Sequence, residues 1–220
     1  MFKKIVFYIG FSILSLSIYA QNFGGGIIGG IDGSQISGDG LAGFNRLGIT
    51  FGGYITFPHQ GKSSIRMELN YIQKGSRTNF TFTKDSVPYD GSEHHIYHLN
   101  LHYVEIPFLY LYELNKRITL EAGFSAGVFI SSYEEYDGYD ITHVDNRPNF
   151  KPYDLSFALG LYYQISDKFS INARFSNSFL PVRAHYEGAT YVNLSNILSP
   201  TINMGQYNSV LQFTLNYKIK

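Results

Sequence analysis

Hydrophobic and polar residues alternate along most of the chain after residue 22, with the period of two that is typical of β-strands. From Tyr207 to Ile219, most odd positions are apolar and most even positions are polar. A strand with this pattern presents one apolar face and one polar face. The pattern predicts eight strands, at residues 23–36, 47–57, 64–71, 96–114, 118–130, 155–165, 169–176 and 207–219.

The fourth of these segments changes the parity of its apolar residues. They stand at odd positions up to Tyr103 and at even positions from Val104 onward. A change of parity within an extended segment predicts a β-bulge near these two residues. Pro107 follows closely and has no N–H group for a neighbouring strand, which also fits an irregular strand.

Short and long connections alternate between the predicted strands. Residues 58–62, 115–116 and 166–168 form short links, whereas residues 37–46, 74–95, 132–151 and 180–206 form long ones. Outer-membrane barrels have short periplasmic turns and long outer loops. The sequence therefore predicts an all-β fold: an eight-stranded antiparallel up-and-down transmembrane β-barrel. Its apolar parity would face lipid, and its polar parity, rich in Gly and Ser, would face the lumen.

The N-terminus has the order of charge and hydropathy found in secretory signals. Lys3 and Lys4 precede an apolar segment over residues 5–18, and Ala20 offers a small residue before Gln21. The alternative is a retained membrane helix, but about 14 apolar residues fall short of the roughly 20 that a spanning helix needs. We expect a signal peptide at residues 1–20 that is cleaved after Ala20, a barrel domain at residues 21–220, and outer-membrane localisation.

Composition narrows the chemistry that the chain offers. It has no cysteine, which excludes a thiol nucleophile, disulfides and Cys-ligated metals. Its net charge is zero, so nothing indicates a nucleic-acid partner. Charged residues make up 15% and aromatic residues 17% of the chain, a balance that suits a sheet in contact with lipid. Eight strands also enclose too narrow a lumen for a porin channel, which needs about 16 strands.

Two clusters of potential ligands do not predict a metal site. His94, His98 and His102 share one face of a strand, but each step of four residues is roughly 13 Å, too far for a common ion. A pair of His94 and His95, together with a loop carboxylate, could still bind adventitious zinc. The acidic residues of the loop after residue 132 lack the spacing of an EF-hand calcium loop; they are Glu134, Glu135, Asp137, Asp140 and Asp145. We expect no cofactor.

One segment resembles a known family. Residues 101–110, Leu-His-Tyr-Val-Glu-Ile-Pro-Phe-Leu-Tyr, resemble the Tyr-Leu-Glu-Ile-Pro signature of PorT-type outer-membrane β-barrel proteins of Bacteroidetes. Residues 121–127 and 173–176 look like later strands of that family, and the resemblance spans the mature chain. The chain departs from the family pattern at its end, where Lys218, Ile219 and Lys220 follow the aromatic Tyr217. The resemblance implies an outer-membrane barrel and no single biochemical role.

The function that we expect is a non-enzymatic, structural or partner-binding role in the cell envelope, exerted through the external loops. The expected partners are outer-membrane lipid and proteins of the envelope or secretion machinery, and the expected state is a monomeric barrel. One alternative is an enzyme acting on lipid or peptide at the outer rim, where His95 or His143 could meet Asp85 or Asp145. A second alternative is a periplasmic lipocalin-like ligand-binding barrel.

Charged residues of the lumen parity provide the candidate site. Because an unpaired buried charge is costly, we expect them to form one mutually paired network that plugs the barrel. The strand order places Arg66 beside three carboxylates on neighbouring strands, with Arg174 reaching across the lumen. The predicted members are Arg66, Glu68, Glu105, Glu121 and Arg174.

Overall fold

The computed structural model describes residues 23–39, 43–59, 61–82, 93–143, 148–184 and 205–220, although the side chains of residues 78–82 and 93–95 lie outside the description. Within these residues the chain forms nine strands and no helix that is long and apolar enough to cross a membrane. The strands are β1 (Gly24–Ser37), β2 (Arg46–Pro58), β3 (Ser63–Phe82), β4 (Glu93–Glu113), β5 (Ile118–Tyr136), β6 (Tyr139–Asp140), β7 (Tyr153–Gln164), β8 (Phe169–Ser178) and β9 (Tyr207–Lys218).

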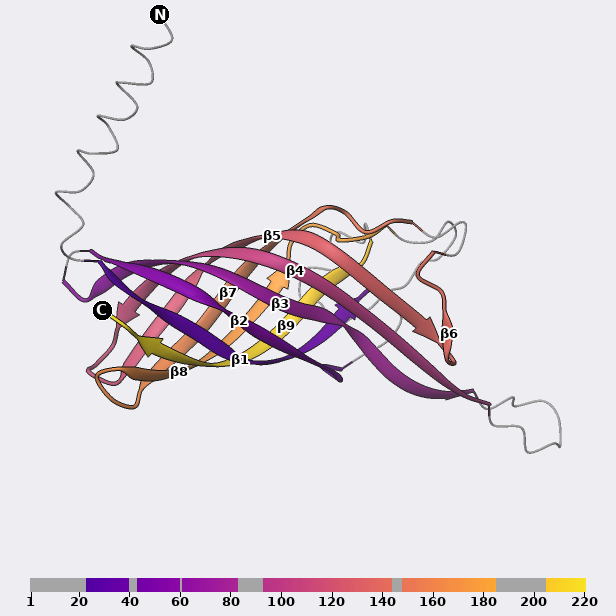
Figure 1. Ribbon diagram of the computed structural model, residues 1–220, viewed down its shortest axis with the longest axis horizontal. Helices are drawn as coiled ribbons and strands as arrows, with labels where there is room; N and C mark the ends of the chain where they lie inside the picture. Colours follow the sequence, from indigo (N-terminus) through magenta and orange to yellow (C-terminus); the bar gives the residue numbers. More distant parts are fainter. Residues whose placement is uncertain (1–22, 40–42, 60, 83–92, 144–147, 185–204) are drawn as a thin grey trace, which may run out of the picture.

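Eight of the nine strands form a closed antiparallel barrel (Figure 1). Each barrel strand pairs with the next barrel strand in the sequence, including β4 with β5. The first and last strands, β1 and β9, also pair with each other. The β1–β9 pairing runs from Gly26↔Lys218 to Ser37↔Tyr207 and so joins the two ends of the barrel sequence. The remaining strand, β6, has two residues and forms a short hairpin with the end of β5. The predicted eight-stranded barrel is therefore confirmed.

The two ends of the barrel differ. We call the end that carries the short turns, together with the start of β1 and the end of β9, the turn end, and the opposite end the loop end (Figure 1). At the turn end, Asn115 Oδ1 accepts hydrogen bonds from the backbone N–H groups of Arg117 and Ile118, which fixes the tight β4–β5 turn.

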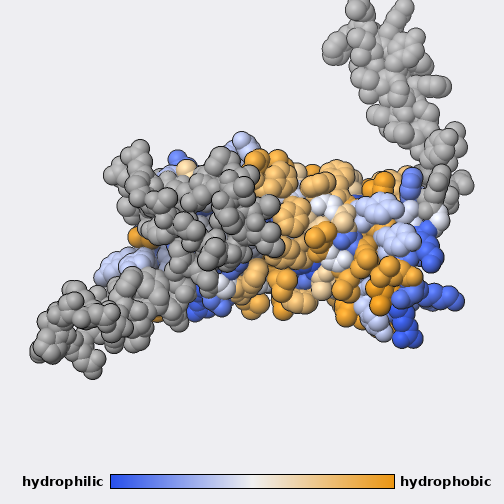
Figure 2. All heavy atoms as spheres, turned by 180° about the vertical axis from the view of Figure 1, so that it is seen from behind, coloured by the Kyte–Doolittle hydropathy of each residue, from blue (hydrophilic) through white to orange (hydrophobic). Residues whose placement is uncertain are grey.

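An apolar belt surrounds the barrel. Large hydrophobic side chains on the outward parity are exposed on every barrel strand, among them Ile31, Phe51, Leu69, Phe108, Phe124, Leu159, Ile171 and Phe213. Figure 2 shows the belt as a band of hydrophobic residues, with hydrophilic residues gathered at the turn end. An exposed apolar band around a closed barrel is typical of contact with lipid. The inward parity is mostly polar, so the predicted assignment of faces agrees with the structure.

The irregularity predicted near Tyr103 and Val104 is present in the β4–β5 pair, but β4 itself keeps its parity. Its odd residues are buried on the inside from Leu99 to Leu111, and the even apolar residues from Ile106 onward are exposed on the outside. The change of parity read from the sequence reflects an apolar patch inside the lumen, formed by Leu99, Leu101 and Tyr103 with residues of β1, β3 and β9. The register does shift at His102/Tyr103, but the extra residue, Ile130, lies on β5.

Parts of the predicted long loops are strand. β3 and β4 pair from Lys74↔Leu101 to Phe82↔Glu93, and β5 continues to Tyr136, where Asp137 and Gly138 turn the chain into β6. We call residues 74–82, 93–101 and 131–136 with β6 the projection, because in Figure 1 they extend beyond the other strands at the loop end. The alternation of apolar and polar residues is weaker in the projection because several of its outward residues are polar, namely Arg77, His98 and Glu135.

Reversing the polarity of one belt residue tests the assignment of faces. Phe124 lies near the middle of β5 and is 66% exposed. A charge at the bilayer midplane on the lipid face of a barrel costs about 2–4 kcal/mol, so we expect Phe124→Arg to lower the free energy of unfolding in lipid vesicles by that amount. Tyr139→Arg is the matched control because Tyr139 is 73% exposed on β6, beyond the belt. Equal effects of the two substitutions would contradict the assignment.

Candidate functional site

The candidate site is the barrel interior, where buried ion pairs lie at three levels. Two of these levels consist of ion pairs between barrel strands, and the third ties a loop-end segment to the projection. An apolar cluster lies in the lumen towards the loop end, formed by Ile36, Ile72, Leu99, Leu101, Tyr103 and Val210. The described interior is therefore filled by side chains over much of its length.

The first level, which we call the arginine network, is centred on Arg174 of β8. Its guanidinium binds Glu68 through Nη1 (2.8 Å) and Nη2 (2.9 Å), and it binds Glu121 through Nε (2.8 Å) and Nη2 (3.0 Å). Each carboxylate thus receives two parallel N–H bonds, the geometry that makes arginine–carboxylate pairs strong. All three side chains are buried.

Strand register explains how Arg174 reaches Glu121. Glu121 of β5 pairs with Gly160 of β7, and Gly160 pairs with Arg174 of β8, so the three residues stand in one row. A Cβ at position 160 would lie 2.4 Å from Glu121 Oε1 and 2.5 Å from the backbone oxygen of Ala173. The glycine therefore leaves the space through which the two charged side chains meet.

Neutral groups complete the arginine network. Tyr162 donates its hydroxyl to Glu68 Oε1 (3.2 Å), and Asn70 donates to Glu68 Oε2 (2.8 Å). Asn172 donates to Glu121 Oε1 (2.9 Å). A buried carboxylate needs several donors to offset its lost hydration. Both carboxylates have them here.

Arg66 lies at the edge of this network, on its turn-end side. Its Nη1 is 3.9 Å from Glu68 Oε1, and it donates to the neutral oxygens of Thr56 (3.3 Å) and Asn216 (3.2 Å). The guanidinium stacks on the rings of Tyr54 (3.9 Å to the centroid) and Tyr162 (4.5 Å). Arg66 is therefore held mainly by aromatic faces and neutral acceptors.

Glu105 belongs to a different level, so the expected single network of five residues is not what forms. Glu105 pairs in register with Asn70, two residues nearer the loop end than Glu68, and its carboxylate binds Lys74 Nζ at 2.5 Å. Lys74 also binds Asp154 Oδ2 at 2.9 Å. The other four predicted residues lie together in the arginine network.

Lys74 and Asp154 are central to this second level, the lysine network, and were missed in the sequence. Ser178 and Asn208 donate to Asp154 at 2.6 and 2.8 Å, and the Lys74 ammonium lies 5.2 Å from the centre of the Tyr103 ring. Lys74 was taken as the start of a loop, and the sixth predicted strand, which corresponds to β7, was expected to begin one residue after Asp154. The signal was present nonetheless, because both residues continue the inward parity of their strands.

The third level, the outer bridge, was also missed. Arg183 Nη1 binds Glu134 Oε2 at 2.9 Å, and Tyr97 donates its hydroxyl to Glu134 Oε1 at 2.6 Å. Burial and the adjacent Glu134 carboxylate raise the pKa of Tyr97, so its hydroxyl remains a donor. Arg183 also stacks on Phe150 at 4.5 Å. Glu134 was expected in an acidic loop, but it faces inward from β5.

The residues considered for rim chemistry are placed only in part. His143 is exposed, while Asp85, Asp145 and the side chain of His95 lie outside the described residues. Within the described part of the chain, no three His, Asp or Glu side chains gather in a way that could hold a metal ion.

Comparisons with known proteins place the chain among outer-membrane barrels. Residues 4–184 match the family model described as outer membrane protein beta-barrel domain. Searching curated protein sequences gives no significant match.

Several solved structures are similar in outline. The attachment invasion locus protein Ail of Yersinia pestis, solved with the heparin analogue sucrose octasulfate, is 13% identical, with 90% of this chain and 99% of that chain covered and a TM-score of 0.45. Neisserial surface protein A is 9% identical, with coverage of 89% and 96% and a TM-score of 0.48. The N-terminal barrel domain of Pseudomonas aeruginosa OprF is 11% identical, with coverage of 88% and 99% and a TM-score of 0.35.

Removing the shared cation tests the arginine network. Arg174→Ala leaves the buried carboxylates of Glu68 and Glu121 without their main partner, so we expect a loss of about 3–5 kcal/mol in the free energy of unfolding. The triple variant Arg174→Met, Glu68→Gln, Glu121→Gln removes all three charges together and should lose less. Urea titration in lipid vesicles measures both. An Arg174→Ala variant as stable as the parent protein would mean that the carboxylates are independently hydrated.

Proposed function

Because the chain belongs to the outer membrane protein beta-barrel domain family, we propose that it is a sealed, non-enzymatic outer-membrane barrel whose projection contacts a partner outside the cell. The projection is the observation that carries this proposal. Shorter strands would be long enough to form the apolar belt. β3 and β4 nevertheless continue to pair in register for nine residue pairs beyond Gln73↔His102.

The projection is supported on its inner face, and its outer face carries polar side chains among the described residues. Its inner face carries Leu99, Leu101 and Glu134, and the outer bridge holds Arg183 against Glu134. Its outer face carries Arg77, which is exposed, and the half-buried His98 and Glu135. A sheet held rigid from one side presents a fixed set of polar side chains on the other, which favours binding.

Orientation follows from the turns. Short turns are periplasmic in bacterial outer-membrane barrels, so we assign the turn end to the periplasm and the projection to the cell exterior. The expected partners are outer-membrane lipid around the belt and proteins of the cell envelope or secretion machinery, bound by a monomeric barrel. The described interior offers ion pairs that are already satisfied, which supports a structural role over catalysis at those residues.

Two finer assignments accompany this proposal. The Tyr103–Pro107 segment supports a place among PorT-type proteins of Bacteroidetes. The charge and hydropathy of the first 20 residues support a signal peptide cleaved after Ala20, for which the mass of the exported protein is the check.

Shortening the projection tests the proposal. In the test variant, residues 79–96 are replaced by Asn-Gly, which closes a two-residue hairpin on the Thr78↔Tyr97 pair. We expect this variant to reach the outer membrane and to keep the heat-modifiable gel mobility of a folded barrel. The reason is that the replacement leaves the belt, the arginine network and the lysine network unchanged. It should lose whatever surface adhesion or complex formation the intact protein supports. A variant that retains all such activity would contradict a role for the projection; a lost lipid or peptide modification would instead favour a rim enzyme.

A further inference from the structure

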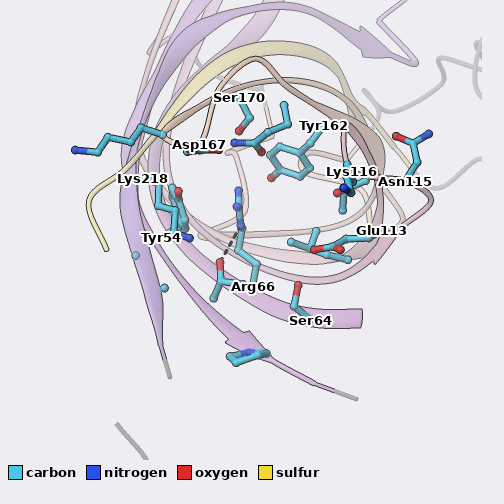
Figure 3. Close-up of a pocket in the computed structure, with 18 residues that line it drawn as sticks. Tyr54, Ser64, Arg66, Glu113, Asn115, Lys116, Tyr162, Asp167, Ser170 and Lys218 are labelled. Carbon is cyan, nitrogen blue, oxygen red and sulfur yellow. Dashed lines mark hydrogen bonds between the residues drawn. The ribbon is translucent and has the colours of Figure 1, made fainter. Parts of the chain in front are cut away.

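An open pocket of about 660 Å³ occupies the turn end of the barrel, below the arginine network (Figure 3). It has the size of a binding site for a small ligand or a short segment of a ligand. In Figure 3 the Arg66 side chain rises into the middle of the ring of strands, with Tyr162 opposite it. The proposed function does not use this pocket.

The pocket is positively charged. Among the described residues that line it, four are basic (Arg66, Lys116, Lys168 and Lys218) and two are acidic (Glu113 and Asp167). The lysines belong to the short turns and to the end of β9, so they surround the mouth, whereas Arg66 is buried at the inner end. Arg66 lies three residues along β3 from Ser63, which is roughly 10 Å along the tilted strand.

The charge of Arg66 is poorly compensated within the barrel. Its carboxylate neighbour Glu68 is 3.9 Å away and already accepts two bonds from Arg174, one from Tyr162 and one from Asn70. The hydrogen bonds of Arg66 itself go to neutral oxygens. A carboxylate from outside could therefore gain a charge-assisted bond with Arg66 without displacing an existing ion pair.

The remaining lining matches a peptide. Side-chain hydroxyls and amides line the wall between the mouth and Arg66, and these groups can donate to and accept from a peptide backbone; they include Thr56, Ser64, Thr119, Gln164 and Ser170. Positive charges at two depths also suit a chain with several carboxylates better than one compact anion.

We propose that this pocket binds an acidic peptide segment from the periplasm, with one carboxylate held by Arg66 and further carboxylates held by the lysines at the mouth. The periplasmic source rests on the orientation given under the proposed function. Binding itself does not, so the two can fail separately.

The test uses the full barrel from Gln21, refolded in detergent, and a fluorescein-labelled peptide Gly-Ser-Glu-Ser-Glu-Glu with a free C-terminus, followed by fluorescence anisotropy. We expect saturable binding that Arg66→Gln weakens about tenfold or more, since a hydrogen bond to a charged group contributes roughly 1.5–3 kcal/mol. Arg77→Gln, which removes the same charge from the exposed face of the projection, should bind like the parent protein. Heat-modifiable gel mobility confirms that each variant is folded.

Further peptides identify the carboxylate. A C-terminally amidated peptide that binds as well as the free acid assigns Arg66 to a side-chain carboxylate, and one that loses binding assigns it to the C-terminus. A peptide with Gln in place of each Glu should bind far more weakly. If Arg66→Gln fails to fold, the triple variant Lys116→Gln, Lys168→Gln, Lys218→Gln must weaken binding instead. Absence of binding, binding unchanged in the folded Arg66→Gln variant, or complete displacement by equimolar citrate would overturn the proposal.

Discussion

Closure of the sheet is the constraint on which the rest of this structure depends. Inside hydrocarbon no water is available to backbone N–H and C=O groups, so a sheet must satisfy them by pairing every edge. The β1–β9 and β4–β5 pairings achieve this with eight strands, the β1–β9 pair joining strands that are farthest apart in the sequence. With so few strands the lumen is only wide enough for side chains. Inward residues of the middle levels are consequently packed between the walls, and a buried charge among them is costly without a partner.

The charges inside follow from that narrowness. Arg174 satisfies two carboxylates at once because Gly160 leaves room between β5 and β8, and Lys74 does the same for Glu105 and Asp154 one level farther on. Arg174 thus joins β8 to β3 and β5, and Lys74 joins β3 to β7, in each case between strands that are not neighbours in the sheet. Satisfied ion pairs hold the walls together but leave little capacity for chemistry. The surfaces available for function are then the two ends: the projection at one, and the pocket below Arg66 at the other.

The sequence predicted the barrel well because lipid enforces a strict alternation on the outward face. The predicted ends of β3, β4 and β5 at the loop end were nevertheless wrong. The projection lies beyond the belt, so its outward residues do not have to be apolar and the alternation is lost. Of the site, Arg66, Glu68, Glu121 and Arg174 were recognised by parity alone. Glu105 was placed with them because parity gives the face but not the height, which depends on register and stagger. Lys74, Asp154 and Arg183 escaped notice because they flank the segments whose alternation is clear. The bulge predicted near Tyr103 lies at the right level but on β5, because the change of parity in β4 comes from the apolar lumen patch around Leu101.

The central claim is that paired charges and the apolar cluster seal the lumen, and ion conductance tests it most directly. Purified protein reconstituted into planar lipid bilayers in about 1 M KCl would be compared with a porin standard, at a salt concentration that screens surface charge. The account predicts that insertion produces no stable conductance steps, because the interior lacks a continuous aqueous path through the arginine and lysine networks. Reproducible, long-lived, ohmic steps from the folded protein would contradict it, and would show that the lumen contains water where the structure places ion pairs.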